Sequence, residues 1–464
     1  MLTRKNKYLI AIFSVLGSLT ALVPIVTIWF SGNSSRVLFE GSYVVDKFSL
    51  ILKAIFILAT YLVIVISVKY VESDEYYQGE YYFLLLCSLL GAIIIASSRD
   101  LIILFIGIEL ASAPMFLLSG WKKGSYESNE GAIKFFLLGV LSAALILYGF
   151  SLLYGLTGHI TFEGISSSLI SLDNNAIGLA IMLVVAGIGF KISAVPFHSW
   201  APDTYQGAPV PITAYLSVAS KAAGFVTLLL FTTKIVPSFG IIWGPILLVI
   251  AGVTMTVGNL IALQQSNGVR LLAYSSISQA GFILAPIAAS GFTSNFQDSI
   301  FATVTYIAIY TFMNIGAFVV VLAASQINNT FDIYKWGSLA KNFPFIGICS
   351  ALFFFSLAGI PPLGGWFAKF VVFRSLLSSS NTFVTVLAVI GAVNAVIALV
   401  YYARVVKIIW MDEPEVQDSH SVLPKVDQSL AFVGVFTLVI TVVVGFFPNI
   451  FGVLGVAATQ LLSP

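Results

Sequence analysis

Apolar residues run in long blocks through this chain, and few polar positions interrupt them. Blocks of about 20 residues suit helices that cross a hydrocarbon layer of about 30 Å. A membrane β-barrel would instead show alternating segments of about ten residues. The pattern therefore predicts an all-α membrane protein with about thirteen spans, over residues 8–30, 47–71, 80–98, 100–121, 131–156, 176–200, 209–233, 240–264, 270–291, 299–325, 344–380, 383–411 and 429–448.

Two predicted spans are interrupted by glycine and proline. The span 176–200 contains Pro196 shortly after Lys191, and 344–380 contains Gly359 to Pro362 shortly before Lys369. Proline removes an amide donor, and lipid tolerates the freed carbonyl only where protein or a watery cavity satisfies it. Paired broken helices are typical of transporters built from repeats, although a simple packing kink is the alternative.

The two breaks lie five spans apart, so we expect two inverted halves of five helices each. Four regions follow from this division. They are N-terminal peripheral helices in 1–78, a first repeat in 79–235, a second repeat in 236–411, and a loop with the last span in 412–464.

Composition supports a membrane protein and excludes several functions. The chain has 464 residues, of which 59% are hydrophobic and 9% charged, and the mean hydropathy is +1.00. A net charge of +2 indicates no nucleic-acid partner. No large soluble region is left for NAD, flavin or iron–sulfur chemistry, and Cys87 and Cys349 lack ligand spacing. We therefore expect no metal or cofactor in this chain.

The basic start predicts the orientation. Arg4, Lys5 and Lys7 precede the first span, and most other basic loop residues fall on the same side. The positive-inside rule then places the N-terminus in the cytoplasm and, with an odd number of spans, the C-terminus outside. No small-residue cleavage site follows, so the first span is expected to be retained rather than cut as a signal peptide.

Five ionisable residues stand within apolar runs, and each is a candidate for moving protons. A charge at the bilayer centre costs about 2.5–3.5 kcal/mol on insertion scales, so such residues usually pair and mark an ion path. Lysine can take and release a proton when it is desolvated. The alternatives are a protonated glutamic acid bonded to a neighbouring helix and, for Lys134, a lysine that snorkels to the surface. The five residues are Glu109, Lys134, Lys191, Lys221 and Lys369.

A polar trail lies between these candidates. Tyr306, Tyr310 and Asn314 recur every four residues on one helix face, and Gln279 follows several serines. Hydroxyls and amides can anchor water, whereas helix–helix hydrogen bonding is the ordinary explanation. Together with the lysines they favour a hydrated path.

The stretch from Gly189 to Phe225, with Lys191, Pro196-Phe-His198-Ser-Trp200, Asp203 and Lys221, closely resembles subunit N (chain 2) of the proton-pumping NADH:quinone oxidoreductase, respiratory complex I. Matches extend from about Tyr81 to Trp410. The resemblance implies an antiporter-like fold of two inverted five-helix bundles, with one proton channel. It also implies a bacterial cytoplasmic membrane location, and partnership with neighbouring membrane-arm subunits and the lipid bilayer.

The same resemblance implies roles for individual residues. Glu109 would pair with Lys191, Lys221 would be the central relay and Lys369 would lead to the exit. Lys134 matches a further family lysine, and His198 and Asp203 lie within the motif.

Two departures from the family pattern stand out. One N-terminal helix is missing, and Gln279 replaces a family histidine, so no protonation can occur there. A subunit of a multisubunit cation/proton antiporter is the alternative function.

Overall fold

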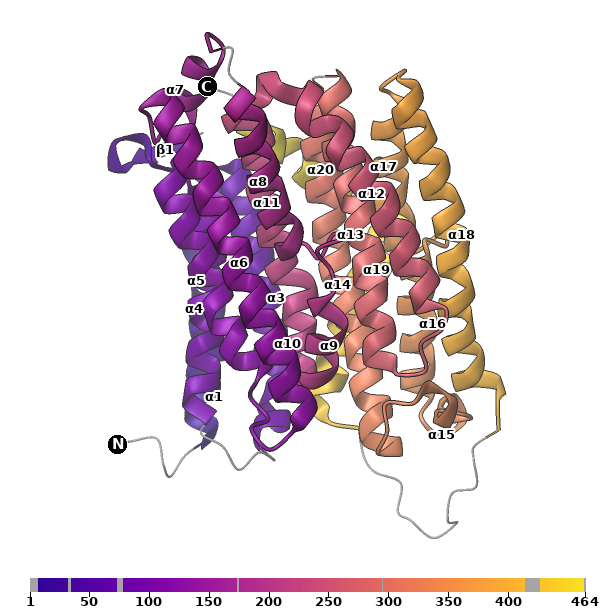
Figure 1. Ribbon diagram of the computed structural model, residues 1–464. Coiled ribbons are helices and arrows are strands. Elements are labelled where there is room, and N and C mark those ends of the chain that lie inside the picture. Colours follow the sequence, from indigo (N-terminus) through magenta and orange to yellow (C-terminus); the bar gives the residue numbers. More distant parts are fainter. Residues whose placement is uncertain are drawn as a thin grey trace.

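Long helices run side by side through the molecule (Figure 1). This computed structural model describes residues 7–31, 35–72, 78–172, 175–293, 295–413 and 426–462. In these ranges, 11 helices are long and apolar enough to cross a membrane. Each overlaps one predicted span, and the two remaining predicted spans contain the broken helices.

The N-terminal region combines helices with a hairpin that the hydrophobic pattern did not predict. Strand β1 pairs antiparallel with β2, with Leu38 opposite Tyr43. Both strands are short and lie in a connection between predicted spans. The elements are α1 (Lys7–Thr20), α2 (Leu22–Phe30), β1 (Ser35–Leu38), the 3₁₀ turn η1 (Phe39–Gly41), β2 (Tyr43–Asp46) and α3 (Lys47–Glu72).

The first half contains the first break, between α8 and α9. Asp100 begins α5 by accepting a hydrogen bond from the Ile103 amide, which is a normal N-cap. Two π-helical turns interrupt the last long helix of this half. The elements are α4 (Gln78–Ser97), α5 (Leu101–Ser119), α6 (Tyr126–Thr157), α7 (Phe162–Leu169), α8 (Asn175–Lys191), α9 (Trp200–Gly207), α10 (Val210–Tyr215), η2 (Leu216–Ser220), α11 (Lys221–Leu230) and η3 (Phe231–Ile235).

The second half contains the second break, between α16 and α17. Gly359 ends α16 at a φ of 94°, in the left-handed region that glycine adopts without strain. The elements are η4 (Pro237–Phe239), α12 (Gly240–Ala262), α13 (Gly268–Thr293), α14 (Phe296–Asn328), η5 (Ile333–Lys335), α15 (Leu339–Asn342), α16 (Pro344–Ala358), α17 (Gly364–Leu377) and α18 (Thr382–Met411).

The C-terminal part adds one helix more than the prediction. After α19 (Gln428–Phe446) come α20 (Asn449–Ala458) and η6 (Thr459–Leu462), which pack against α14. In Figure 1, α1 begins near the lower end of the view and α20 lies near the upper end. Arg4 and Lys5, on which the predicted orientation partly rests, lie outside the described residues.

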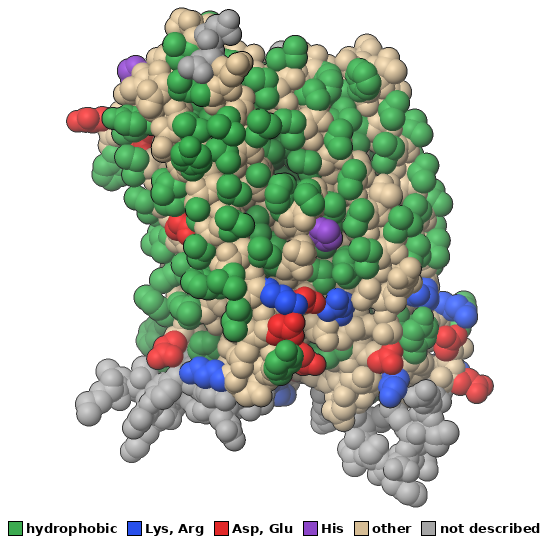
Figure 2. Space-filling model, viewed as in Figure 1, with side chains coloured by type: hydrophobic (Ala, Val, Ile, Leu, Met, Phe, Trp, Pro, Cys, Tyr) green, Lys and Arg blue, Asp and Glu red, His purple; other side chains and the backbone are tan. Residues whose placement is uncertain are grey.

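Burial separates central helices from peripheral ones. In their most apolar windows, α14 is 100% buried and α13 is 94% buried, whereas α6 and α18 are each 33% buried. Figure 2 shows hydrophobic side chains over most of the visible face and charged side chains mainly near its lower edge. The central helices therefore have no lipid-facing side, and polar groups on them face only other helices.

Candidate functional site

Lys191 ends α8 at the first break and faces α5. Its Nζ donates a hydrogen bond to the Ser112 hydroxyl at 2.8 Å and lies 3.6 Å from Glu109 Oε1. Ser112 and Glu109 are three residues apart, so they share one face of α5. The Lys191 side chain is 11% exposed and that of Glu109 is 33% exposed. The structure thus brings together the two charges that the family resemblance paired, as an ion pair rather than a short hydrogen bond.

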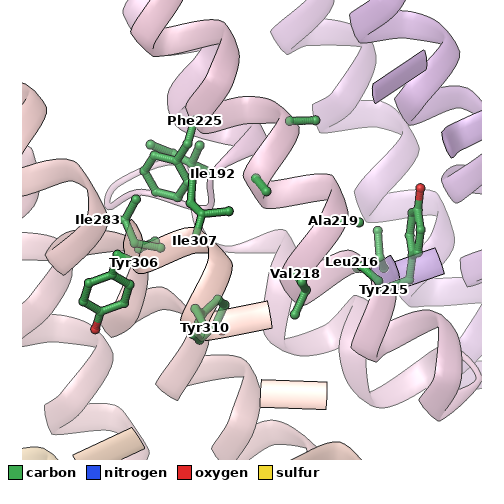
Figure 3. Close-up of a cluster of buried hydrophobic side chains, with 14 of the residues drawn as sticks. Ile192, Tyr215, Leu216, Val218, Ala219, Phe225, Ile283, Tyr306, Ile307 and Tyr310 are labelled. Carbon is green, nitrogen blue, oxygen red and sulfur yellow. The ribbon is translucent and has the colours of Figure 1, made fainter. Parts of the chain in front are cut away.

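Lys221 begins α11 at the centre of the molecule and is 3% exposed. Its Nζ donates to the Ser276 hydroxyl of α13 at 2.8 Å and lies 5.7 Å from the centre of the Tyr205 ring. In the described part of the chain, no carboxylate lies within 4 Å of this ammonium. Phe225, Ile283 and Ile307 line a cavity together with Lys221. Figure 3 shows these three apolar side chains in the buried cluster.

Lys369 lies on α17, beyond the second break, and is 5% exposed. Its Nζ donates to the carbonyl of Ala358 at 2.6 Å and lies 4.9 Å from the centre of the Phe282 ring. A Cβ at Gly359 would come within 2.7 Å of the Lys369 side chain, so glycine is needed there for space as well as for its φ. Across the ranges that the structure covers, this lysine also has no carboxylate partner.

The polar trail on α13 and α14 makes specific contacts. Gln279 accepts a hydrogen bond from the Tyr306 hydroxyl and donates to the Leu357 carbonyl at 3.1 Å. Asn314 donates to the Ser217 hydroxyl at 2.7 Å. The hydroxyl of Tyr310 is buried and makes no hydrogen bond of normal geometry. Helix–helix bonding therefore accounts for part of the trail, but not for Tyr310.

Two small cavities adjoin the buried amines. One is lined by Lys191, Ser112 and Ser220 among others, and the second by Lys221, Ser276 and Tyr310 among others. Each has a volume of about 10 Å³. A cavity of about 10–15 Å³ with polar partners has room for one water molecule.

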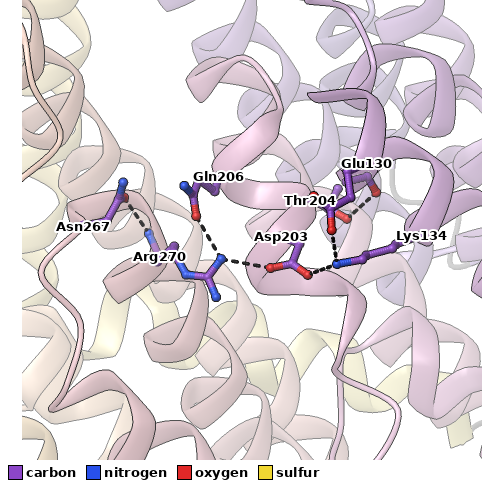
Figure 4. A network of polar contacts seen from close by, with 8 residues as sticks. Glu130, Lys134, Asp203, Thr204, Gln206, Asn267 and Arg270 are labelled. Carbon is purple, nitrogen blue, oxygen red and sulfur yellow. Dashed lines mark hydrogen bonds and ion pairs between the residues drawn. The ribbon is translucent and has the colours of Figure 1, made fainter. Parts of the chain in front are cut away.

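Lys134 does not lie in the apolar interior. Its side chain is 42% exposed, and its Nζ binds Glu130 at 2.7 Å and Asp203 at 2.6 Å. Of the two alternatives from the sequence, the surface position is the one observed. The lysine nevertheless belongs to a network, because the second oxygen of Asp203 accepts from Arg270 at 2.9 Å (Figure 4).

This network joins the two halves, since Lys134 lies on α6, Asp203 on α9 and Arg270 on α13. Burial raises the pKa of Asp203, but hydrogen bonds from Lys134 and Arg270 outweigh that effect and lower it. His198, in the segment of the first break, is only partly buried, and among the described residues its Nδ1 makes no hydrogen bond of normal geometry.

Several contact residues were not predicted as site residues. Arg270 and Ser276 precede Gln279 on α13, but their partners Asp203 and Lys221 come from the other half of the chain. Tyr402, on α18, could not be recognised from the sequence, because it lies 123 positions from Gln279, the residue that it contacts. In the described residues, no group of three or more His, Cys, Asp or Glu side chains could hold a metal ion.

Comparison with known proteins shows the family of this chain. Residues 98–396 match the family described as "NADH:quinone oxidoreductase/Mrp antiporter, TM". NADH-quinone oxidoreductase subunit N from Desulfitobacterium hafniense is 36% identical over 96% of this chain and 90% of its own length.

Two solved structures share the fold. A chain of respiratory complex I from Thermus thermophilus with bound aureothin has a TM-score of 0.79 and 28% identity, covering 97% of this chain and 94% of that one. A chain of the Mrp complex from Dietzia sp. has a TM-score of 0.87 at 20% identity, covering 98% of this chain and 93% of that one, and so shows the fold alone. The buried lysines thus stand in an antiporter-like fold, and this chain belongs to the NADH-quinone oxidoreductase subunit N family.

Proposed function

We propose that this chain is a proton-translocating membrane-arm subunit of NADH:quinone oxidoreductase. The observation that carries the proposal is a set of three lysines, each at most 11% exposed, of which one has a carboxylate partner among the described residues. A charge in apolar surroundings is expensive, so such residues are retained for a function. Electron transfer takes place in other subunits, and this chain itself needs no cofactor.

Each ionisable residue takes one step of proton transfer, in the order in which these residues occur from the first half of the chain to the second. Glu109 and Lys191 form the pair at the first break that opens and closes. Lys221 passes the proton between the halves, and Lys369 delivers it toward the exit. Lys134 and Asp203 form the polar group nearest the surface, where protons enter, and His198 lies along this approach.

Four regions serve this function. Residues 1–78 supply peripheral helices, and 79–235 and 236–411 form the two inverted repeats. Residues 412–464 contain a loop and the last membrane span. The N-terminus faces the cytoplasm and the C-terminus the periplasm. The partners are the other membrane-arm subunits, which transmit the energy of quinone reduction to the lysines.

A subunit of a multisubunit cation/proton antiporter is the second candidate, because the description of the matching family also names the Mrp antiporter. The test purifies the complex through a tag on this chain and reconstitutes it in vesicles. We expect quinone reduction to drive proton uptake without sodium. Sodium–proton exchange in the absence of any electron donor would favour the antiporter instead.

A further inference from the structure

One helix connects the two unpaired lysines. Ser276, which binds Lys221, and Gln279, which reaches the second break, are three residues apart and share a face of α13. This helix is buried on all sides, so Gln279 has an exposed fraction of 0%. Through Ser276 and Gln279, α13 therefore links the surroundings of Lys221 to the end of α16, where Lys369 is bonded.

Gln279 and Lys369 bind neighbouring peptide groups. The Gln279 amide donates to the Leu357 carbonyl at 3.1 Å, and Lys369 Nζ donates to the next carbonyl, that of Ala358, at 2.6 Å. The last carbonyls of a helix lack partners within the helix, and the break leaves these ones free. The glutamine thus fixes the end of α16, to which the lysine nitrogen is bonded.

Gln279 also holds two tyrosine hydroxyls. Its Oε1 accepts from Tyr306 and its Nε2 donates to Tyr402 at 3.3 Å, while Tyr402 in turn bonds to Ser275. A glutamine side chain has two donors and one acceptor oxygen, so both donors are in use. The amide has no proton to release, and it cannot act as a relay itself.

We propose that Gln279 is a positioning residue, which fixes Tyr306, Tyr402 and the end of α16 so that a proton crosses from Lys221 to Lys369 through neutral hydroxyls and water. The inference rests on the proposed function. The Lys221 ammonium gives its proton to a water in the cavity beside Tyr310, each carrier accepts one proton and releases another, and the Lys369 amine becomes an ammonium. No group between the two lysines retains the charge.

The test uses Gln279→Leu and Gln279→His in the reconstituted complex, with protons and electrons measured together. Leucine keeps the size of the side chain but removes all three hydrogen bonds. We expect its proton-to-electron ratio to fall to that of Lys221→Arg. Histidine introduces a group that titrates near pH 6.5. We expect a ratio that changes between pH 6 and pH 8 in this variant, whereas the parent stays flat.

Asn259→Leu is the matched control. Asn259 is a buried amide of the same half, bonded to Asn394 and Tyr401, and it touches no lysine of the path. It should lower thermal stability and leave the ratio unchanged. A parental ratio in Gln279→Leu, or a flat pH profile in Gln279→His, would overturn the inference. If Lys221→Arg also keeps the parental ratio, the proposed function itself fails.

Discussion

The two breaks hold their lysines in different ways. At the first break, Lys191 lies 3.6 Å from a carboxylate. At the second, Lys369 contacts a carbonyl and an aromatic ring, and no carboxylate of the described residues pairs with it. When Lys191 loses its proton, the negative charge of Glu109 has no counter-charge. When Lys369 loses its proton, a positive charge that had no counter-charge disappears. Both sites place a lysine beside a broken helix. We therefore expect Lys191 to stay protonated beside Glu109, and Lys369 to release its proton more readily.

Removing the Glu109–Lys191 ion pair should have the largest effect on stability and pumping. Glu109→Gln leaves the Lys191 ammonium without its counter-charge, which costs about 3–5 kcal/mol for a buried pair. Because Glu109 is 33% exposed, we expect the lower end of that range, together with loss of pumping. Thermal unfolding of the detergent-solubilised complex and vesicle pumping measure the two effects.

Glu130→Gln is the control for that substitution. Glu130 binds Lys134 at 2.7 Å, but both side chains are more than 40% exposed, so removing this pair should cost at most about 1 kcal/mol. Equal losses of stability in the two variants would contradict the distinction between a buried and an exposed pair.

Removing the lysine at the second break should separate stability from function. Lys369→Met deletes a charge that has no ionic partner in the described chain, so we expect unchanged or higher thermal stability with loss of proton transfer. Lys191→Met is the comparison, because it leaves Glu109 unpaired and should destabilise. A large loss of stability in Lys369→Met would show that the second site depends on its charge for folding.

The network at the edge should show a small, pH-dependent effect. The pKa of Asp203 is lowered in the folded chain, so its contribution to stability is present above its unfolded value of about 4 and is lost as pH falls through the lower folded value. Asp203→Asn should therefore cost about 1 kcal/mol or less near neutral pH, with no change between pH 6 and pH 8. Thermal unfolding at several pH values measures this, and a cost that varies over that range would contradict the lowered pKa.

The hydrophobic pattern predicts much of this fold because lipid fixes the length of an apolar helix. Apart from 176–200 and 344–380, the predicted spans from 47–71 to 429–448 recur as helices within about five residues at each end. The proline–glycine runs mark the breaks in the two exceptions. The hairpin of β1 and β2 and helix α20 were not predicted, because both are too short for a spanning signal.

The site could be predicted only in part for a related reason. A lysine inside an apolar run is visible in the sequence, so the burial of Lys191, Lys221 and Lys369 could be expected, whereas their part in proton transfer is a proposal. Their partners depend on how distant helices pack. The contacts of Lys134 with Asp203, and of Gln279 with Tyr402, join positions 69 and 123 residues apart and leave no local pattern.

The central claim is that the buried lysines carry protons, and Lys221→Arg tests it most directly. Arginine keeps the positive charge but does not release its proton. In the reconstituted complex, quinone reduction and proton translocation are measured in the same vesicles. We expect an assembled complex with a lower proton-to-electron ratio than the parent. A parental ratio in this variant would show that Lys221 is only structural and would contradict the account.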